Sequence, residues 1–405
     1  MQDEPIGFLI PEFPGQTHIA WWRVAQELKK LGHPVQLLST RRPDSASGVH
    51  PLLERDVETV LFAWPPGFAH VLGEIVRNPL GAWRAGRYLA SLTQSSVRQK
   101  IALLPILLSS LYLASELRRR GIKYVFVHSC ANAAHLLAMC NRISGVRYAL
   151  RLGGDPDVYG RDHHHKMQRA EFVLSASPSY FDELIDKHGV DPGKLHWSWV
   201  GTDLSFYTTD PAWPHNRDGN RLRIATVARL NLAKGHLYAL EAVRALVSAS
   251  RPVDYTLIGD GPYRGEIESF IAEHGLGTHV HLLGSKDAAE IARILQATDI
   301  TILASVGAGE AAPAVVCESM AAGVPVLATR IGATEHMIKN GVDGFVVKQH
   351  DSDAILDHLL NLAEDADRLA EMKMAAKASA AQFDVRLTAE KILDLFQDAQ
   401  AQRLP

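Results

Sequence analysis

Cysteine is scarce in this 405-residue chain, which has three, Cys130, Cys140 and Cys317. They lie inside apolar runs, they are odd in number and no two form a CxxC pair. This usage excludes a disulfide framework and a cysteine-based metal site. A reduced, cytoplasmic compartment fits it best.

Long hydrophobic runs are also missing. The longest, Ile101 to Ala114, has about 14 residues and includes Pro105, whereas a helix needs about 20 apolar residues to span a bilayer. The start, Gln2-Asp3-Glu4-Pro5, lacks the basic residues and apolar core of a signal peptide. We therefore expect a protein that is neither exported nor integral to a membrane.

The charge has little excess of either sign, and a net charge of −3 gives no reason to expect nucleic acid. Its distribution is uneven, because residues 70–150 hold 11 basic residues against only Glu74 and Glu116. The stretch Arg77–Arg120 alternates these cations with apolar residues. Two interpretations are equally favoured here: docking on anionic lipid, or core helices with a solvated cationic face.

The length fits two domains of roughly 200 residues. Short β-branched runs alternate with amphipathic stretches, which predicts an α/β fold with parallel, doubly wound sheets. A linker is expected at residues 210–220, which have two prolines and a glycine. The predicted domains are therefore residues 1–209 and 210–384, both Rossmann-like. Strands are expected at Ile6–Ile10, Val35–Ser39, Tyr124–His128, Tyr148–Leu152, Leu222–Val227, Asp254–Ile258, His279–Leu283, Ile300–Ala304 and Val324–Thr329.

Ligands of open α/β sheets bind at the carboxyl ends of the strands, and two facing domains would form a cleft there. Arg229 and Lys234 bracket a loop between a predicted strand and a predicted helix. The helix amides and dipole favour an anion, which these two cations would help to clamp as a diphosphate. Two solvated surface cations are an equally good explanation of this motif alone.

Two glutamates define a second motif. Glu318 lies in an apolar helical segment that begins near Pro313, and a buried carboxylate needs partners such as the two hydroxyls of a ribose. Glu310 precedes that helix beside small residues that leave room for a sugar. The alternative, carboxylates favoured by a helix dipole, explains Glu310 better than Glu318.

Five motifs in this order resemble glycosyltransferase family 4, whose members are retaining enzymes with the GT-B fold. The motifs are Arg229/Lys234, Leu257–Pro262, Glu310-x7-Glu318, Ala322–Val326 and Gly332–Glu335. The resemblance is detailed over residues 220–350. It implies that Arg229 and Lys234 neutralise the donor diphosphate, Glu318 binds the ribose and Glu310 contacts the transferred sugar. It also implies a C-terminal helix, about 385–405, that packs back on the first domain.

The resemblance extends to further donor-binding candidates. Ser285 and Lys286 fall in the loop expected to meet the base, and Gly15 and Gln16 fall in the loop near the donor phosphates. Ala312 stands where many members have a bulky residue. The full donor set is Gly15, Gln16, Arg229, Lys234, Ser285, Lys286, Glu310, Ala312, Pro313, Ala314, Val315 and Glu318.

The N-terminal half has fewer markers. His128 ends a strand, as a histidine of the family often does, and Asp155 follows the next one. The segment Arg151–Asp157, with Gly153-Gly154, falls where many members have a His-Gly pair, so a glycine replaces the catalytic histidine of those members. Asp155 is a catalytic and acceptor-side candidate, with a turn-forming role as the alternative. The run His163–His165 is expected to be exposed and not a metal site.

The hypothesis is a retaining glycosyltransferase that moves a hexose from a UDP-sugar to a saccharide or lipid-linked acceptor in polysaccharide biosynthesis. Catalytic candidates are Glu310, Arg229, Lys234 and Asp155, with no metal and no other cofactor expected. Lipid-linked acceptors favour peripheral docking on an anionic membrane surface. The alternatives are a sugar-nucleotide epimerase and a non-catalytic sugar-nucleotide-binding protein. A hydride-transfer enzyme is disfavoured because the first βα turn has no GxGxxG.

Overall fold

The computed structural model describes residues 4–13, 19–42, 56–199, 201–207, 221–307 and 310–402. The chain divides into two compact units. The first comprises Met1–Gly201 together with Val385–Pro405, and the second comprises Thr202–Asp384. The linker expected at residues 210–220 lies outside the described residues.

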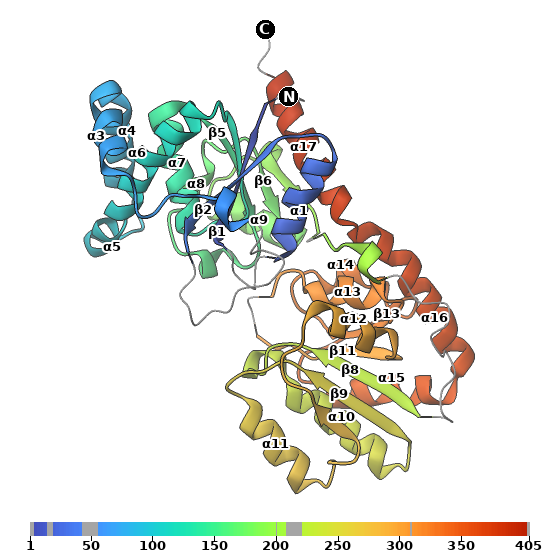
Figure 1. The fold of residues 1–405 in the computed structure, drawn as a ribbon. Helices are drawn as coiled ribbons and strands as arrows, with labels where there is room; N and C mark the ends of the chain where they lie inside the picture. Colours follow the sequence, from blue (N-terminus) through green and yellow to red (C-terminus); the bar gives the residue numbers. More distant parts are fainter. Residues whose placement is uncertain are drawn as a thin grey trace. The chain divides into compact units, whose positions relative to one another are not determined.

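The first unit is built on a parallel sheet of seven strands in the order β3-β2-β1-β4-β5-β6-β7 (Figure 1). The strand order reverses between β1 and β4, which is where an open α/β sheet leaves a crevice at its carboxyl edge. Its elements are β1 (Ile6–Glu12), α1 (Ile19–Lys30), β2 (Val35–Arg41), β3 (Leu61–Phe62), α3 (Phe68–Arg77), α4 (Pro79–Ser91), α5 (Val97–Ala102), α6 (Leu104–Arg119), β4 (Tyr124–Val127), α7 (Asn132–Ser144), β5 (Arg147–Leu152), α8 (His163–Met167), β6 (Val173–Ser175), α9 (Phe181–Asp186), β7 (Leu195–Trp197) and α17 (Val385–Ala401).

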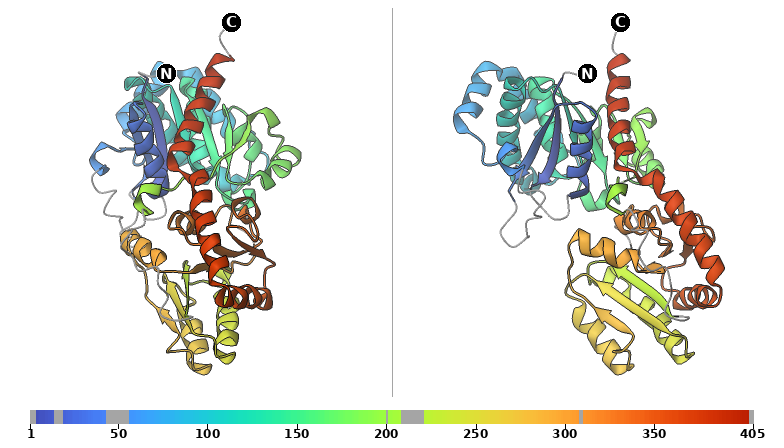
Figure 2. Two further views of the ribbon diagram at one scale, coloured as in Figure 1. Left: turned by 90° about the vertical axis from the view of Figure 1, so that its right-hand side faces the viewer. Right: turned by 45° about the vertical axis from the view of Figure 1, so that its right-hand side comes forward.

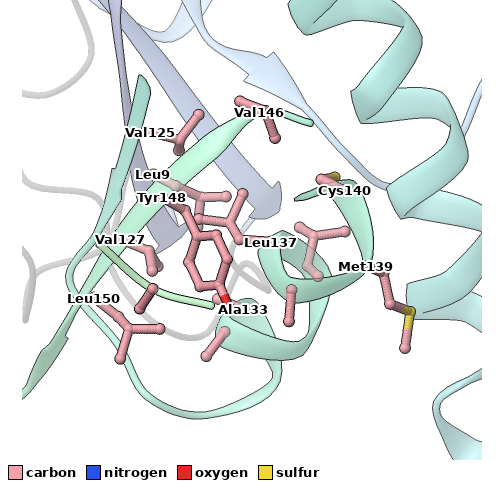
Figure 3. Packing of buried hydrophobic residues seen from close by; sticks show 14 of the residues in the cluster. Leu9, Val125, Val127, Ala133, Leu137, Met139, Cys140, Val146, Tyr148 and Leu150 are labelled. Carbon is pink, nitrogen blue, oxygen red and sulfur yellow. The ribbon is translucent and has the colours of Figure 1, made fainter. Parts of the chain in front are cut away.

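Successive side chains of each strand enter different cores, because they point to opposite faces of the sheet. In β4, Val125 and Val127 pack in the cluster that includes α7, whereas Tyr124 and Phe126 pack with α1 and α17. Figure 3 shows Tyr148 of β5 among the side chains of strands and α7. Both faces of this sheet are therefore covered by helices.

The helix α17 closes one face of the first sheet. It lies beside α1 in every view (Figures 1 and 2), and Ile392 and Phe396 are fully buried there. Phe396 also packs edge-on against Tyr124 and Phe172. The last helix of the chain is thus part of the core of the first unit.

The second unit contains a parallel sheet of six strands in the order β10-β9-β8-β11-β12-β13. Here the order reverses between β8 and β11. The elements are β8 (Leu222–Val227), α10 (His236–Ser248), β9 (Val253–Ile258), α11 (Arg264–Glu273), β10 (Val280–Leu282), α12 (Ala288–Gln296), β11 (Ile300–Leu303), α13 (Ala314–Ala321), β12 (Val326–Thr329), α14 (Thr334–Met337), β13 (Gly344–Val347), α15 (Ser352–Glu364) and α16 (Ala366–Ser379), with a short 3-10 turn at Leu232–Lys234.

These two sheets confirm the predicted fold class, α/β with two doubly wound parallel sheets. One prediction about the first unit needs correction. By length and composition, the helical stretch Val97–Arg119 is apolar enough to cross a membrane, although 44% of its most apolar window is buried. The sequence-based expectation counted only the apolar run Ile101–Ala114, whereas the stretch formed by α5 and α6 extends beyond that run at both ends. A buried core helix passes the same test.

Candidate functional site

A cavity of about 410 Å³ lies in the second unit at the carboxyl ends of β8 and β11. This is the point where the strand order reverses, the usual ligand site of such a sheet. The cavity brings together six of the predicted donor-binding residues. Its lining is Val227, Ala228, Arg229, Asn231, Lys234, Leu303, Glu310, Pro313, Ala314 and Val315.

The best-defined polar contact in the cavity joins Lys234 to Glu310. The ammonium of Lys234 lies 2.5 Å from Oε1 of Glu310, and the hydroxyl of Ser305 donates to Oε2 at 2.7 Å. Both side chains of the ion pair are about one-fifth exposed. Sequence analysis placed both residues at the site but did not predict that they pair.

Arg229 supplies a positive charge that no described carboxylate pairs with. Its side chain is exposed at the cavity and forms no ion pair within the described parts of the chain. The backbone carbonyl of Arg229 accepts a hydrogen bond from Nε2 of His236 at 3.1 Å. His236 is buried, and this desolvation lowers the pKa of its imidazole. His236 therefore holds the Arg229 loop as a neutral ring, a role that sequence analysis missed.

The N-terminus of α13 points into the same cavity through Pro313, Ala314 and Val315. No side chain caps this helix end, and its first turn has no acidic residue. Its amides and dipole therefore favour an anion. The sequence had pointed instead to the helix that follows Lys234.

Asn231 is a second residue that sequence analysis missed. It lines the cavity, and its side-chain oxygen is buried without a hydrogen-bond partner in the described chain. A buried amide oxygen without a partner costs free energy, which a ligand donor would offset. In the sequence, only its position inside the Arg229–Lys234 loop could have indicated that Asn231 belongs to the site.

Two glycines, Gly235 and Gly332, fix the backbone of the loops that line the cavity. Gly235 has a φ of +60°, and a Cβ added there would lie 1.9 Å from the carbonyl oxygen of Ala304. Gly332 has a φ of +54°, and its Cβ would lie 2.0 Å from the carbonyl oxygen of Glu310. No other residue permits this conformation and this backbone approach together. These glycines therefore fix the loops that carry Lys234 and Glu310.

The remaining donor candidates lie outside the lining of this cavity. Glu318 is on α13 one turn beyond Ala314 and is half-buried, not buried as its apolar neighbours had suggested. Ala314 and Glu318, one turn apart, are the two positions of this helix that are not buried, because Val316, Cys317, Ser319 and Met320 lie on its buried face. Ala312 precedes the helix and is half-buried.

The loop after β10 carries the two residues expected near the base. Ser285 is exposed, and the ammonium of Lys286 lies 3.3 Å from a carboxylate oxygen of Glu290 at the start of α12. The carbonyl of Gly284 accepts from the amide of Gly259, which ties this loop to the end of β9.

Of the N-terminal candidates, Gly15 and Gln16 lie outside the described residues. His128 follows β4 and stacks on Trp21 with ring centroids 5.2 Å apart. Asp155 caps the short 3-10 turn Pro156–Tyr159 by accepting from the amide of Asp157 at 3.0 Å. This is the turn-forming role that the sequence left open, and a catalytic role for Asp155 stays a prediction.

The histidine run is only partly the exposed segment that was expected, because His164 is exposed, His165 is half-buried and His163 is buried. It forms the helix α8, and His163 is only 1% exposed because α8 packs against α7. The three rings contact different partners: His163 the carbonyl of Gly160, His164 the carbonyl of His188, and His165 the carboxylate of Asp162. Among the described residues, no three His, Cys, Asp or Glu side chains are grouped as a metal site requires.

Comparison with known proteins identifies the second unit. Residues 210–379 match the family model described as glycosyl transferases group 1. The amylovoran biosynthesis glycosyltransferase AmsK of Erwinia amylovora is 34% identical over 161 residues, which cover 39% of this chain and 40% of AmsK. WcaL of Escherichia coli K12, named for colanic acid biosynthesis, is 27% identical over 224 residues, 54% of each chain. The matches thus span about half the length of these relatives.

A solved structure shows the same fold over nearly the whole chain. Anabaena HepE in complex with UDP has a TM-score of 0.73 and 17% identity, and the match covers 98% of this chain and 100% of HepE. The fold is therefore GT-B, as predicted. The chain contains a group 1 glycosyltransferase domain, which confirms the recognition of a glycosyltransferase from its motifs.

Proposed function

We propose that this group 1 glycosyltransferase protein is a retaining enzyme that transfers a hexose from a UDP-sugar to a saccharide or lipid-linked acceptor in polysaccharide biosynthesis. The observation that carries the proposal is the cavity that joins Arg229, Lys234, Glu310 and the N-terminus of α13. A structural neighbour, HepE, is described with UDP and with UDP-glucose, which supports this class of donor.

The charges of the cavity suit a diphosphate. Lys234 is already balanced by Glu310, so Arg229 and the uncapped end of α13 carry the unopposed positive potential. A diphosphate between them would be held by charge-assisted hydrogen bonds and would draw Lys234 towards itself. Glu310 would then be released to accept from hydroxyls of the hexose.

In the proposed step, the acceptor hydroxyl attacks the anomeric carbon from the face that the diphosphate leaves. The bond between that carbon and the phosphate oxygen breaks, and its electron pair passes to the diphosphate. The leaving phosphate accepts the proton of the acceptor hydroxyl. Arg229 and Lys234 stabilise the charge that develops on the diphosphate, which lowers the barrier because the cations are already in place.

The direct test is a screen of nucleoside diphosphate sugars, with release of the nucleoside diphosphate as the measured signal. We expect one UDP-hexose to give release that increases with an acceptor extract, and an α-linked product. Conversion of a donor into its epimer without release would support the epimerase alternative. Binding without any turnover across donors and acceptors would support the binding-protein alternative.

We also predict metal independence. The two cations and the α13 amides supply the charge that a metal would otherwise supply to the leaving diphosphate. Activity should therefore persist at its original level after exhaustive dialysis against EDTA. Activity that is lost in EDTA and restored by manganese or magnesium would contradict this.

We further propose that the first unit docks on an anionic membrane surface. Large apolar side chains are exposed along α3, α4, α5 and the start of α6, namely Phe68, Leu72, Val76, Leu80, Trp83, Val97, Ile101 and Leu104. The cations Arg77, Arg84, Arg87 and Arg98 are exposed among them. Exposed apolar and basic residues together are typical of helices that bind anionic lipid.

The two acidic residues of α3 and α6, Glu74 and Glu116, are buried, so the exposed charges of these helices are positive. Glu74 is 2% exposed and receives two hydrogen bonds from Arg118, and Glu116 is 3% exposed and pairs with Arg119. Arg118 and Arg119 are therefore engaged in ion pairs. The cations Arg77, Arg84, Arg87 and Arg98 form no ion pair among the described residues.

We expect the full chain to float with vesicles of phosphatidylcholine and phosphatidylglycerol and to be released by high salt. Replacing two exposed side chains, as Val76→Ser with Trp83→Ser, should weaken the partition by about 10-fold or more, because apolar area no longer enters the interface. Leu387→Ser removes an exposed leucine from α17, away from this surface, and is the control. Equal flotation of all three proteins would exclude this surface.

A further inference from the structure

A second cavity, of about 530 Å³, lies wholly within the first unit. It is formed by the segments that follow β4 and β5, on the carboxyl side of the first sheet, together with α5 and the residues next to it. None of its residues was a candidate from the sequence. Its lining is Ser95, Gln99, Ala102, Leu103, Asn132, His135, Asp157, Tyr159, Gly160, Arg161 and Lys166.

A buried ammonium lies in the wall of this cavity. Lys166 is 0% exposed, and its Nζ donates to the carbonyls of Cys130 and Tyr159, each at 2.9 Å. An ammonium has three donors, and within the described chain these two bonds are its only ones and no carboxylate pairs with it. Burial lowers the pKa of Lys166, and an anion in the cavity would oppose that shift.

Further groups add positive potential and hydrogen bonds. Arg161 is exposed at the rim, with one nitrogen donating to the carbonyl of Gln94 at 3.0 Å. The helix α7 begins at Asn132 and directs its positive end here. Asp157 is the one carboxylate of the lining, so two cations face one anion.

The neutral part of the lining suits a sugar. Gln99, Asn132 and Tyr159 offer amide and phenol groups, which can bind hydroxyls as donors or acceptors. His135 is bonded through Nδ1 to the hydroxyl of Tyr88, and burial lowers its pKa to about 3, so its ring is neutral. A cavity with cations and neutral hydrogen-bonding groups is chemically matched to a phosphorylated saccharide.

The helix α5 separates this cavity from the exposed apolar surface. Gln99, Ala102 and Leu103 line the cavity, whereas Val97, Ile101 and Leu104 are 46 to 74% exposed. These two sets follow helical spacing and occupy opposite faces. The loop before α5 is fixed to α8, because the carboxylate of Asp162 accepts from the amides of Thr93 and Gln94 at 2.9 Å. A ligand in the cavity is therefore one helix away from an apolar surface.

We infer that this cavity binds the phosphosaccharide head group of the acceptor, an inference that rests on the proposed glycosyl transfer. Arg161 and Lys166 hold the phosphate, and Gln99, Asn132 and Tyr159 contact the sugar. The outer face of α5 receives the chain of an acceptor that is carried by a lipid. The same chemistry would also fit a free phosphosaccharide, and the experiment separates these two sources.

The first arm titrates glucose 1-phosphate into the full chain by calorimetry with saturating UDP present, so that the C-terminal cavity is occupied. We expect saturable binding that Arg161→Gln weakens by about 10-fold, because a charge-assisted bond is lost. Gln99→Ala should weaken it less, and the control Arg169→Gln, an exposed arginine outside the cavity, should not change it. Arg161 and Gln99 are exposed, so the test does not depend on replacing buried Lys166.

The second arm compares glucose 1-phosphate with the same head group esterified to a polyprenol, glucosyl polyprenyl phosphate, in phosphatidylcholine vesicles. The lipid-linked probe should bind more tightly, and Val97→Ser with Ile101→Ser should remove that gain while leaving glucose 1-phosphate affinity unchanged. Equal affinities would overturn the role of α5 and leave a free phosphosaccharide as ligand. Binding of glucose 1-phosphate that is absent, or unaffected by both cavity variants, overturns the proposal. If UDP binds and donor hydrolysis persists in that case, the proposed function stands.

Discussion

Lys234→Ala should reduce kcat/KM for glycosyl transfer by at least about 100-fold, which corresponds to roughly 2.7 kcal/mol of transition-state stabilisation. The charge on the leaving diphosphate grows as its bond to the sugar breaks, and Lys234 lies in the cavity where that charge would develop. The ammonium is held by Glu310 within the cavity, so the protein itself positions it. Steady-state kinetics with the UDP-hexose found in the donor screen provides the measurement.

The matched control is Lys348→Ala, which removes an exposed lysine of the second unit outside the cavity and should retain wild-type kinetics. Lys234→Ala also leaves Glu310 without its partner, so the thermal unfolding of every variant should be compared. Lys234→Arg keeps the charge and should recover part of the activity. A folded Lys234→Ala protein with wild-type kcat/KM would show that the diphosphate is bound elsewhere.

Much of the fold could be predicted from the sequence because the central strands are fully buried. Such strands read as short β-branched runs, and Leu222–Val227 was predicted with the bounds that the structure has. β3, β6, β7 and β13 were not predicted. They contain only two to four residues, too few to show a clear periodicity, and they form only where neighbouring strands pair with them.

The site could be predicted in part. Arg229, Lys234 and Glu310 carry charge in motifs with a fixed spacing, and the structure brings all three into one cavity. Their mutual arrangement was not predictable, because Lys234 and Glu310 are 76 residues apart and meet only when β8 and β11 lie side by side.

Burial was the weakest sequence-based prediction. Glu318 was expected to be buried because its neighbours are apolar, yet a helix can leave one position of an apolar segment at the surface. The reverse holds for His163, a polar residue that α8 places in the core through contacts with distant residues. Composition within a window does not determine which face of a helix packs.

The second large effect should distinguish Glu310 from Glu318. Glu310→Ala should lower transfer from the intact donor by about 100-fold, because the lost carboxylate orients the hexose in the transition state. UDP carries no hexose, so its affinity should change little. Glu310→Ala also releases Lys234 from its ion pair, which leaves the ammonium available to the diphosphate and would not weaken the binding of UDP.

Glu318→Ala should instead weaken the binding of UDP itself, by roughly 1–3 kcal/mol, because charge-assisted hydrogen bonds to the ribose hydroxyls are lost. The half-buried position of Glu318, one turn beyond the cavity-lining Ala314, leaves its carboxylate able to reach a nucleoside that extends from the bound diphosphate. Calorimetric titration of UDP into both variants, beside turnover assays, separates the two roles. Glu371→Ala, an exposed glutamate of α16, is the control for both measurements. Loss of UDP affinity in Glu310→Ala but not in Glu318→Ala would reverse the assignment, and would place the nucleoside where the hexose is proposed to lie.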